Sequence, residues 1–322
     1  MHRLLISFCL LLVTACSGLD SNVKQTEELA TNPPTPTVTQ QMLPVVLENG
    51  SQVEIYVRTL GQGDKTLVFL HGGPGANHSS LAPFFDDLAD EFRLVYFDQI
   101  AAGKSTPRQP ETYQIGDDVA VIDAVRQHLG VDKWTVVGES WGTMLGLQYA
   151  SVHPSSIEHL ILLSSVGDGP EHLQAFGQSL MSKITPEDLA ALQSLHEAVK
   201  KGESTIDEYL VKSRRIFDRY YLYDPANIGK VVQQDINYQH NQRVAALMEA
   251  ELDFMQRPDA LKSVDIHMYQ AQGDLINPEM IREHLVNELK PDAFTEVPES
   301  GHWIFLEQTD YINGEIRRIA RD

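Results

Sequence analysis

A serine set between two glycines is the strongest chemical signal in the sequence. Residues 138–142 read Gly-Glu-Ser-Trp-Gly, with Ser140 at the centre. The apolar run 134–137 before the motif predicts a buried strand, and residues 143–150 predict a helix. A serine at a tight turn from strand to helix presents its hydroxyl at the edge of the sheet, which is the arrangement of a nucleophile elbow.

A serine hydroxyl is a poor nucleophile at neutral pH, so a base and a group that orients the base must lie nearby. Asp274 follows the predicted strand 266–271, and His302 follows the predicted strand 294–297. The carboxyl ends of parallel strands meet at one edge of a sheet, where catalytic groups collect. The sequence therefore predicts a triad of Ser140, Asp274 and His302.

Other residues compete for these roles. Asp168 follows a predicted strand that ends near Ser165, and it is the alternative acid. His284 falls in a helical stretch and His267 inside a strand, so both are interpreted as packing or surface residues. The sequence contains no His-Glu-x-x-His motif and no clustered spacing of histidines and carboxylates, which disfavours a metal hydrolase.

An acyl-transfer reaction also needs hydrogen-bond donors for the oxyanion of its tetrahedral intermediate. The backbone N–H of Trp141, the residue after the nucleophile, is the first expected donor. Residues 71–75 read His-Gly-Gly-Pro-Gly and directly follow the apolar run 67–70. Gly73 is the expected second donor, because a glycine lets the substrate approach the backbone closely; a plain Gly/Pro turn is the alternative.

Short apolar runs that alternate with helical or loop segments must position these residues. This rhythm predicts an α/β fold, with a mostly parallel sheet covered by helices on both faces. Asn49-Gly50 between two alternating segments predicts a hairpin at the start of the folded part. The apolar runs are 67–70, 94–97, 134–137, 160–163, 266–269 and 294–297.

No strand signal appears between residues 169 and 263, which predicts a helical cap inserted into the sheet. Helices are expected to begin at Thr185 and Thr205, and a third helical stretch is expected over 227–256. The tyrosines at 220, 221 and 223 are interpreted as the interior of the cap, with substrate contact as the alternative. The core is then divided into residues 43–168 and 264–322.

Composition sets outer limits on function. The chain has 322 residues and a formal net charge of −20, which would repel nucleic acid and anionic lipid surfaces. Its two cysteines, Cys9 and Cys16, both lie near the N-terminus. The folded part therefore contains no internal disulfide and no thiolate metal site.

The first residues resemble a targeting signal. Arg3 and the apolar stretch 4–13 predict a signal peptide over residues 1–15. Residues 13–16, Val-Thr-Ala-Cys, resemble the lipobox of bacterial lipoproteins, which makes Cys16 a lipid-anchored N-terminus; an ordinary secretory signal is the alternative. Residues 16–42 are rich in Thr, Pro and Gln and predict a disordered linker. With Ser17 after the cysteine, the expected location is the bacterial cell envelope, at the outer membrane.

Five motifs together resemble the proline iminopeptidase family of serine peptidases, which has the α/β-hydrolase fold. The resemblance covers about residues 43–322. It implies Ser140, Asp274 and His302 as the triad, Gly73 and Trp141 as the oxyanion hole, release of an N-terminal residue that is often proline, and no cofactor. The motifs are residues 71–75, residues 98–99 with Gly103 and Ser105, residues 138–142, residues 273–274 and residues 300–302.

Two departures from the family pattern concern substrate binding. The family's Asp-Gln-Arg-Gly-x-Gly-x-Ser loop is here residues 98–105, Asp-Gln-Ile-Ala-Ala-Gly-Lys-Ser, which lack the arginine and the first glycine. The family also holds the substrate amine with cap glutamates, and their usual sequence is not recognisable. Glu249, Glu251 and Asp253 are candidates, with a solvated helix face as the alternative. Glu139, beside the nucleophile, is another candidate.

The resulting hypothesis is a serine aminopeptidase that acts on small peptides and touches a membrane only through its lipid anchor. An esterase or lactonase with the same triad remains an alternative, since the fold and triad fix acyl transfer but not the acyl group. A non-catalytic surface binding protein on a hydrolase scaffold is a second alternative. Haloalkane dehalogenase and epoxide hydrolase chemistry is disfavoured, because those relatives carry Asp where Ser140 stands.

Overall fold

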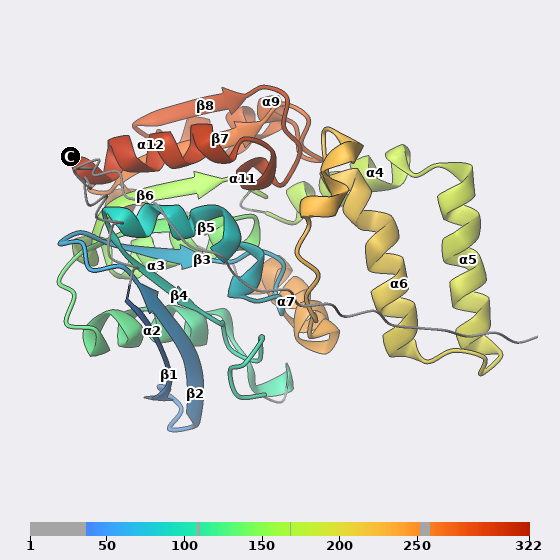
Figure 1. The fold of residues 1–322 in the computed structure, drawn as a ribbon, viewed down its shortest axis with the longest axis horizontal. Helices are drawn as coiled ribbons and strands as arrows, with labels where there is room; N and C mark the ends of the chain where they lie inside the picture. Colours follow the sequence, from blue (N-terminus) through green and yellow to red (C-terminus); the bar gives the residue numbers. More distant parts are fainter. Residues whose placement is uncertain (1–36, 108–109, 168, 252–257) are drawn as a thin grey trace, which may run out of the picture. The chain divides into compact units, whose positions relative to one another are not determined.

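The computed structural model of the chain describes residues 37–107, 110–167, 169–251 and 258–322. One sheet of eight strands organises them, in the order β1-β2-β4-β3-β5-β6-β7-β8 (Figure 1). β1 and β2 are antiparallel to their neighbours, and β4, β3, β5, β6, β7 and β8 run parallel. The strands are β1 (Val38–Val46), β2 (Gln52–Leu60), β3 (Thr66–Leu70), β4 (Arg93–Phe97), β5 (Trp134–Glu139), β6 (Ile157–Leu163), β7 (Asp265–Ala271) and β8 (Ala293–Val297).

The hairpin expected at Asn49-Gly50 joins β1 to β2, with Gly50 at φ +80°. β1 begins at Val38, so residues 38–42 belong to the sheet and not to the linker expected over 16–42. Their side chains are exposed, which is why the apolar alternation starts only at Leu43. Their backbone nevertheless pairs with β2 in one register, from Val38 opposite Leu60. Pairing of the backbone, which needs no apolar side chain, extends the folded part in the N-terminal direction.

Helices cover both faces of the sheet, which confirms the predicted fold class (Figure 1). Alternate residues of the central strands point to opposite faces. Val136 of β5 packs with α2 and α3, whereas Val137 packs with α1 and α12. The α-helices are α1 (Ala82–Phe85), α2 (Ile115–His128), α3 (Trp141–Val152), α4 (Pro170–Lys183), α5 (Pro186–Lys200), α6 (Ile206–Asp218), α7 (Tyr238–Glu251), α8 (Pro258–Leu261), α9 (Pro278–Ile281), α10 (Asn287–Leu289), α11 (Ile304–Glu307) and α12 (Thr309–Arg321).

Shorter helical turns connect these elements. The 3-10 turns are η1 (His78–Ser80), η2 (Asp86–Asp90), η3 (Pro110–Thr112), η4 (Pro154–Ser156), η5 (Arg219–Tyr221) and η6 (Pro225–Lys230), and η8 (Arg282–Val286) is a π-helix. None of the helices in the described ranges combines the length and the apolar character needed to cross a bilayer.

Between β6 and β7 the described residues form helices and their connections, here called the cap. Two of its helices begin at the expected N-cap residues. The Thr185 Oγ1 accepts a hydrogen bond from Asp188 N at 3.2 Å, and the Thr205 Oγ1 accepts one from Glu208 N at 3.1 Å. The helical stretch expected over 227–256 is interrupted: η6 and α7 are helical, but residues 231–237 between them are not. Asn237 N instead donates to the Gly75 carbonyl at 2.9 Å, so this segment is held extended against the core.

Candidate active site

Ser140 stands at a strained turn between β5 and α3. Its φ of 52° and ψ of −120° are unfavourable for a residue with a side chain, and such strain is held by the packing around it. The turn is tight enough that a Cβ at Gly142 would overlap the carbonyl oxygen of Leu70 on the neighbouring strand. The motif glycine at 142 is therefore required by close approach of the backbone.

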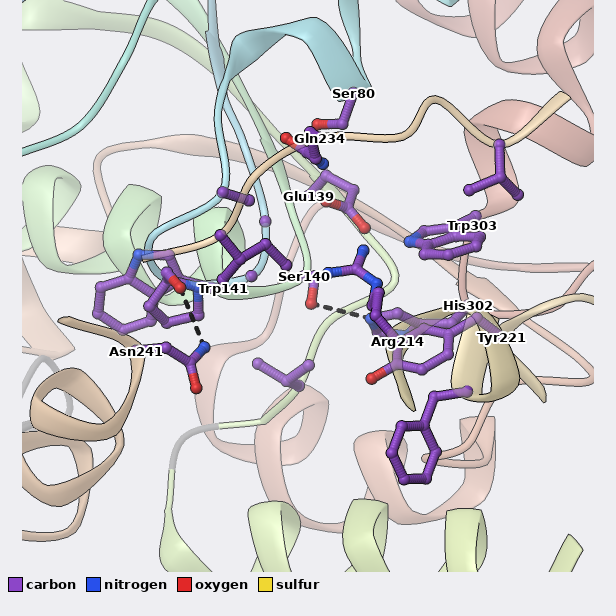
Figure 2. Close-up of a pocket in the computed structure, with 18 of the residues that line it drawn as sticks. Ser80, Glu139, Ser140, Trp141, Arg214, Tyr221, Gln234, Asn241, His302 and Trp303 are labelled. Atoms are coloured by element: carbon purple, nitrogen blue, oxygen red, sulfur yellow. Dashed lines mark hydrogen bonds between the residues drawn. The ribbon is translucent and has the colours of Figure 1, made fainter. Parts of the chain in front are cut away.

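The structure brings the three predicted triad residues together. His302 Nε2 lies 2.8 Å from Ser140 Oγ (Figure 2). His302 Nδ1 lies 2.8 Å from Asp274 Oδ1. Asp274 comes from the loop after β7 and His302 from the loop after β8, and both are buried. Three residues distant in sequence thus form one continuous hydrogen-bonded triad, in which the histidine can take the serine proton and the aspartate orients the histidine.

Asp274 is itself oriented by four hydrogen-bond partners. Gln270 Nε2 donates to Oδ2 at 2.9 Å, whereas Leu275 N at 2.6 Å and Ile276 N at 3.4 Å donate to Oδ1, which also pairs with His302 Nδ1. Burial lowers the pKa of His302, but the Asp274 carboxylate raises it, and the net pKa lies above the usual value of 6.5. The relay therefore stabilises the imidazolium that forms when the serine loses its proton.

Gly73 and Trp141, the two predicted oxyanion donors, both lie on the cavity wall with Ser140. Trp141 is the first residue of α3, so its N–H has no acceptor within that helix. The indole Nε1 of Trp141 donates to Gln99 Oε1 at 2.9 Å, and Gln99 Nε2 donates to the His71 carbonyl at 2.9 Å. These bonds fix the distance between the two loops that carry the donors.

The loop 98–105, which departs from the family pattern, is well held without its arginine. Ile100 replaces that arginine and is fully buried, and Ala101 adopts φ +57° where the family has glycine. Asp98 organises the turn by accepting hydrogen bonds from His78 N at 3.0 Å and Lys104 N at 2.8 Å. The loop's packing therefore survives both substitutions.

Glu139 is buried beside the nucleophile, with 4% of its surface exposed. Burial raises its pKa to about 7, although the His302 ring and the Gly72 N–H each favour the charged form. Its Oε1 has no hydrogen-bond partner among the described residues. A buried carboxylate oxygen without a hydrogen-bond partner is energetically costly, so Oε1 is available to a donor that enters the cavity.

A cavity of about 510 Å³ opens at Ser140, within the size range of small-ligand sites. Among the described residues that line it, Glu139 is the one acidic side chain, Arg214 is the one Lys or Arg, and His302 is the one histidine. Most of the remaining wall is apolar or aromatic. It includes Phe84, Val166, Leu173, Phe176, Leu180, Leu210, Phe217, Tyr221, Met248, Trp303 and Leu306.

Two cap residues of this wall differ from the main sequence interpretation. Tyr221 follows the alternative of substrate contact and not that of cap interior, since its ring stacks on Trp303 with centroids 5.0 Å apart, lies 5.5 Å from the His302 ring and lines the cavity. Tyr220 does belong to the cap interior, since its hydroxyl donates to Asp188 Oδ2 at 2.6 Å. Arg214 of α6 carried no motif, and only the folding of α6 over the core brings it to the site (Figure 2).

Several predicted residues remain without a structural account. Asp168, Asp253 and Cys16 lie outside the described residues. α7 includes Glu249 and Glu251, but their side chains also lie outside the described part, so their role stays a prediction.

One group of side chains has the composition of a metal site, and sequence spacing did not reveal it. Asp265 Oδ2 lies 2.6 Å from His159 Nδ1 and 3.1 Å from His267 Nε2. His159 pairs with Asp265 across neighbouring strands, so the cluster depends on the β6–β7 register. It lies at the amino ends of these strands, whereas Ser140 follows the carboxyl end of β5. It is therefore separate from the triad.

Comparison with known protein families gives matches over the part of the chain that contains the triad. A sequence model of the alpha/beta hydrolase fold matches residues 65–309. A proline iminopeptidase of Lacticaseibacillus rhamnosus is 27% identical over 278 residues, which cover 80% of this chain and 91% of that protein. A probable proline iminopeptidase of Streptomyces coelicolor is 39% identical over 150 residues, 44% of this chain and 46% of that protein. The chain thus spans about half the length of this second relative.

Solved structures share the fold at low sequence identity. Proline iminopeptidase from Mycobacterium smegmatis superposes with a TM-score of 0.61 at 22% identity, over 87% of this chain and 98% of that one. A thermophilic esterase from Thermogutta terrifontis superposes with a TM-score of 0.64 at 19% identity, over 87% and 98%. These two superpositions show that the chain shares the fold of these proteins.

Proposed function

Because the chain belongs to the alpha/beta hydrolase fold family, we propose that it is a serine aminopeptidase that releases an N-terminal residue, proline or another small one, from peptides. The relay from Asp274 through His302 to Ser140 is the observation that carries this proposal. The relatives named as proline iminopeptidases support peptides as the substrate class.

The reaction follows from the relay. His302 Nε2 accepts the proton of Ser140 as Oγ attacks the scissile carbonyl carbon. The resulting oxyanion faces the backbone N–H groups expected from Gly73 and Trp141, each donor contributing about 3 kcal/mol to the stability of the transition state. The imidazolium then protonates the leaving amine. Water, deprotonated by the same histidine, hydrolyses the acyl-enzyme and frees Ser140.

Glu139 supplies the feature that distinguishes an aminopeptidase from an esterase. The substrate of an aminopeptidase has an ammonium group next to the scissile carbonyl, and such a cation needs a buried anion as partner. Glu139 directly precedes Ser140, and its Oε1 is without a partner among the described residues. We therefore assign Glu139 to the substrate ammonium; Glu249 and Glu251 remain candidates for the same role.

A panel of substrates tests the proposal. The wild type is expected to hydrolyse a proline arylamide, and Ser140→Ala is expected to lose this activity by roughly 10⁴-fold or more, because the nucleophile is gone. Ser182→Ala is a matched control, since Ser182 is an exposed serine of α4. Hydrolysis of a short acyl ester is measured for the same proteins, in parallel with hydrolysis of the proline arylamide.

Each rival predicts another outcome of this panel. Activity on the ester alone would replace the peptidase with an esterase or lactonase. Failure of Ser140 to react with a fluorophosphonate probe, together with no hydrolysis at all, would leave a binding protein on a hydrolase scaffold.

We further propose that Cys16 carries a lipid that anchors the protein in the bacterial cell envelope. This location rests on the sequence of residues 1–16, with its short apolar stretch and lipobox-like Val-Thr-Ala-Cys. A single acyl chain binds membranes weakly, so stable anchoring requires more than one chain on the cysteine.

A further inference from the structure

Arg214 is the one positive side chain that the structure places on the wall of the catalytic cavity, among the described residues. The neighbouring wall is apolar and aromatic, and the guanidinium carbon lies 6.0 Å from the ring centroid of Trp303. The mechanism proposed above does not use this charge. The Arg214 side chain keeps 27% of its surface exposed, so a polar group of a ligand in the cavity can reach its charge.

One edge of the Arg214 guanidinium is fixed by Asp218, one turn further along α6. Nε donates to Asp218 Oδ1, and Asp218 has 1% of its surface exposed. Gln233 Nε2 donates to the other oxygen of Asp218 at 3.4 Å. Burial lowers the pKa of Arg214 and Asp218 raises it, with a net rise, so the guanidinium stays charged.

The other edge of the guanidinium is open. Nη1 and Nη2 have no hydrogen-bond acceptor in the described part of the chain, and Figure 2 shows the group directed toward Ser140 and Glu139. Arg214 lies close enough for its charge to favour the ionised form of Glu139, but no ion pair or hydrogen bond joins the two side chains, and Glu139 Oε1 has no hydrogen-bond partner within the same ranges. Two parallel N–H groups at such an edge match the two oxygens of a carboxylate.

We infer that Arg214 binds a carboxylate of the substrate, and that the enzyme is therefore selective for dipeptides. This inference rests on the proposed aminopeptidase function. A dipeptide carries its ammonium on one side of the scissile carbonyl and its carboxylate a few bonds away on the other. Glu139 and Arg214 provide one partner for each charge, with Ser140 in the same wall. In a longer peptide a neutral amide replaces the nearby carboxylate and leaves Arg214 unpaired.

The test compares a dipeptide with its own C-terminal amide. For the wild type, kcat/KM for prolyl-glycine is expected to exceed that for prolyl-glycinamide by roughly tenfold or more, mainly through a lower KM. In Arg214→Gln this ratio is expected to fall to about one, and Arg214→Lys should keep part of it because the charge remains. Arg215→Gln, an exposed arginine next along α6, should keep the full ratio.

Arg214→Gln leaves Asp218 buried without its cation, so folding must be checked by thermal unfolding. The double variant Arg214→Gln/Asp218→Asn removes both charges and gives the same expected ratio of one in a folded protein. An acid-to-amide ratio near one in the wild type, while the proline arylamide is hydrolysed, would overturn the inference and leave the proposed function intact. So would an unchanged ratio in Arg214→Gln.

Failure of the proposed function gives a different result. If neither peptides nor the arylamide are hydrolysed, calorimetry with Ser140→Ala decides the inference. Prolyl-glycine binding at least tenfold tighter than its amide, with the difference lost on adding Arg214→Gln, would support carboxylate binding. Equal binding of the two ligands, or binding of neither, would refute it.

Discussion

Glu139 and His302 are two ionisable groups beside Ser140, and each changes the pKa of the other. The charge of Glu139 raises the pKa of His302, and the charge of His302 lowers that of Glu139. Burial nevertheless raises the pKa of Glu139 to about 7, and the pKa of His302 is raised as well, chiefly by the Asp274 carboxylate. Their protons therefore leave in steps that belong to the pair.

This pair predicts how activity depends on pH. A substrate with a free amine requires Glu139 ionised and His302 neutral, and both conditions are lost as the pH falls. We expect kcat/KM for a proline arylamide to fall steeply below about pH 7, where Glu139 titrates, with a limiting slope of about two on a logarithmic plot. In Glu139→Gln the slope should drop to about one, and kcat/KM on the plateau should fall by roughly tenfold.

A neutral acyl ester provides the control for this experiment. It needs His302 but no ammonium partner, so its limiting slope should be about one in both proteins. Loss of the Glu139 charge lowers the pKa of His302, which should move the ester profile to lower pH in the variant. Parallel pH profiles for amine and ester in the wild type would contradict the assignment of Glu139.

Sequence reasoning identified the residues that carry motifs, and missed those that only the fold brings to the site. Ser140, Asp274 and His302 were predictable because each follows a strand that must end at the same sheet edge. Arg214 was not, and substrate contact was only the alternative for Tyr221, because a helix periodicity does not say which side of a cap faces the core. The His159 cluster escaped for a similar reason, since strand register pairs residues far apart in sequence.

At the scale of elements, the segment 231–237 joins the cap to the core. Asn237 N donates to the Gly75 carbonyl at 2.9 Å, and its Nδ2 donates to the Ala101 carbonyl at 3.0 Å. Its Oδ1 accepts a hydrogen bond from His240 N at 3.1 Å, at the start of α7. One side chain therefore both begins a helix and ties it to the core.

Asn237→Ala is expected to destabilise the protein by about 1–3 kcal/mol, because it removes the helix cap and leaves the Ala101 carbonyl without this donor. The free energy of unfolding in urea measures this loss. Asn237→Asp keeps an oxygen for His240 N but has no donor, so an intermediate loss is expected. Asn287→Ala, at an exposed hydrogen bond to Glu283, should change stability by less than about 0.5 kcal/mol.

The helical elements of the cap were predictable only in part. Thr185 and Thr205 form the expected helix caps, because capping is a local interaction that the sequence contains in full. The break at 231–237 was not expected, since its cause lies in contacts with Gly75 and Ala101. The strand start at Val38 was missed because its pairing uses the backbone of β2.

At the scale of the whole molecule, the proposed anchor and the catalytic domain are separate parts of the chain. Cys16→Ser removes the acylated thiol and changes nothing in residues 37–322. We expect the variant to move from the membrane pellet to the soluble fraction of cells after high-speed centrifugation. Its kcat/KM on the proline arylamide should equal that of the wild type, because the triad lies in the folded part.

A matched control and a contrary outcome complete this prediction. Cys9→Ser changes the other cysteine within the same signal and should leave the protein in the membrane pellet. If Cys16→Ser also stays in the pellet after a high-salt wash, the lipid anchor is wrong and another means of attachment is required.

The contacts between residues 231–241 and the loop of Gly73 also restrict how this scaffold can diversify. Asn237 N and Asn241 Nδ2 donate to the carbonyls of Gly75 and Pro74 at 2.9 and 3.0 Å, and Gln234 Oε1 accepts from Asn77 N at 2.9 Å. Substitutions in residues 231–241 that break these hydrogen bonds would displace the loop that carries Gly73 and so reduce catalysis. In contrast, no residue of α5 is among those that line the cavity. We therefore expect substitutions at the wall-lining residues of α4 and α6 to change substrate preference, and substitutions in residues 231–241 that break these hydrogen bonds to reduce turnover of every substrate.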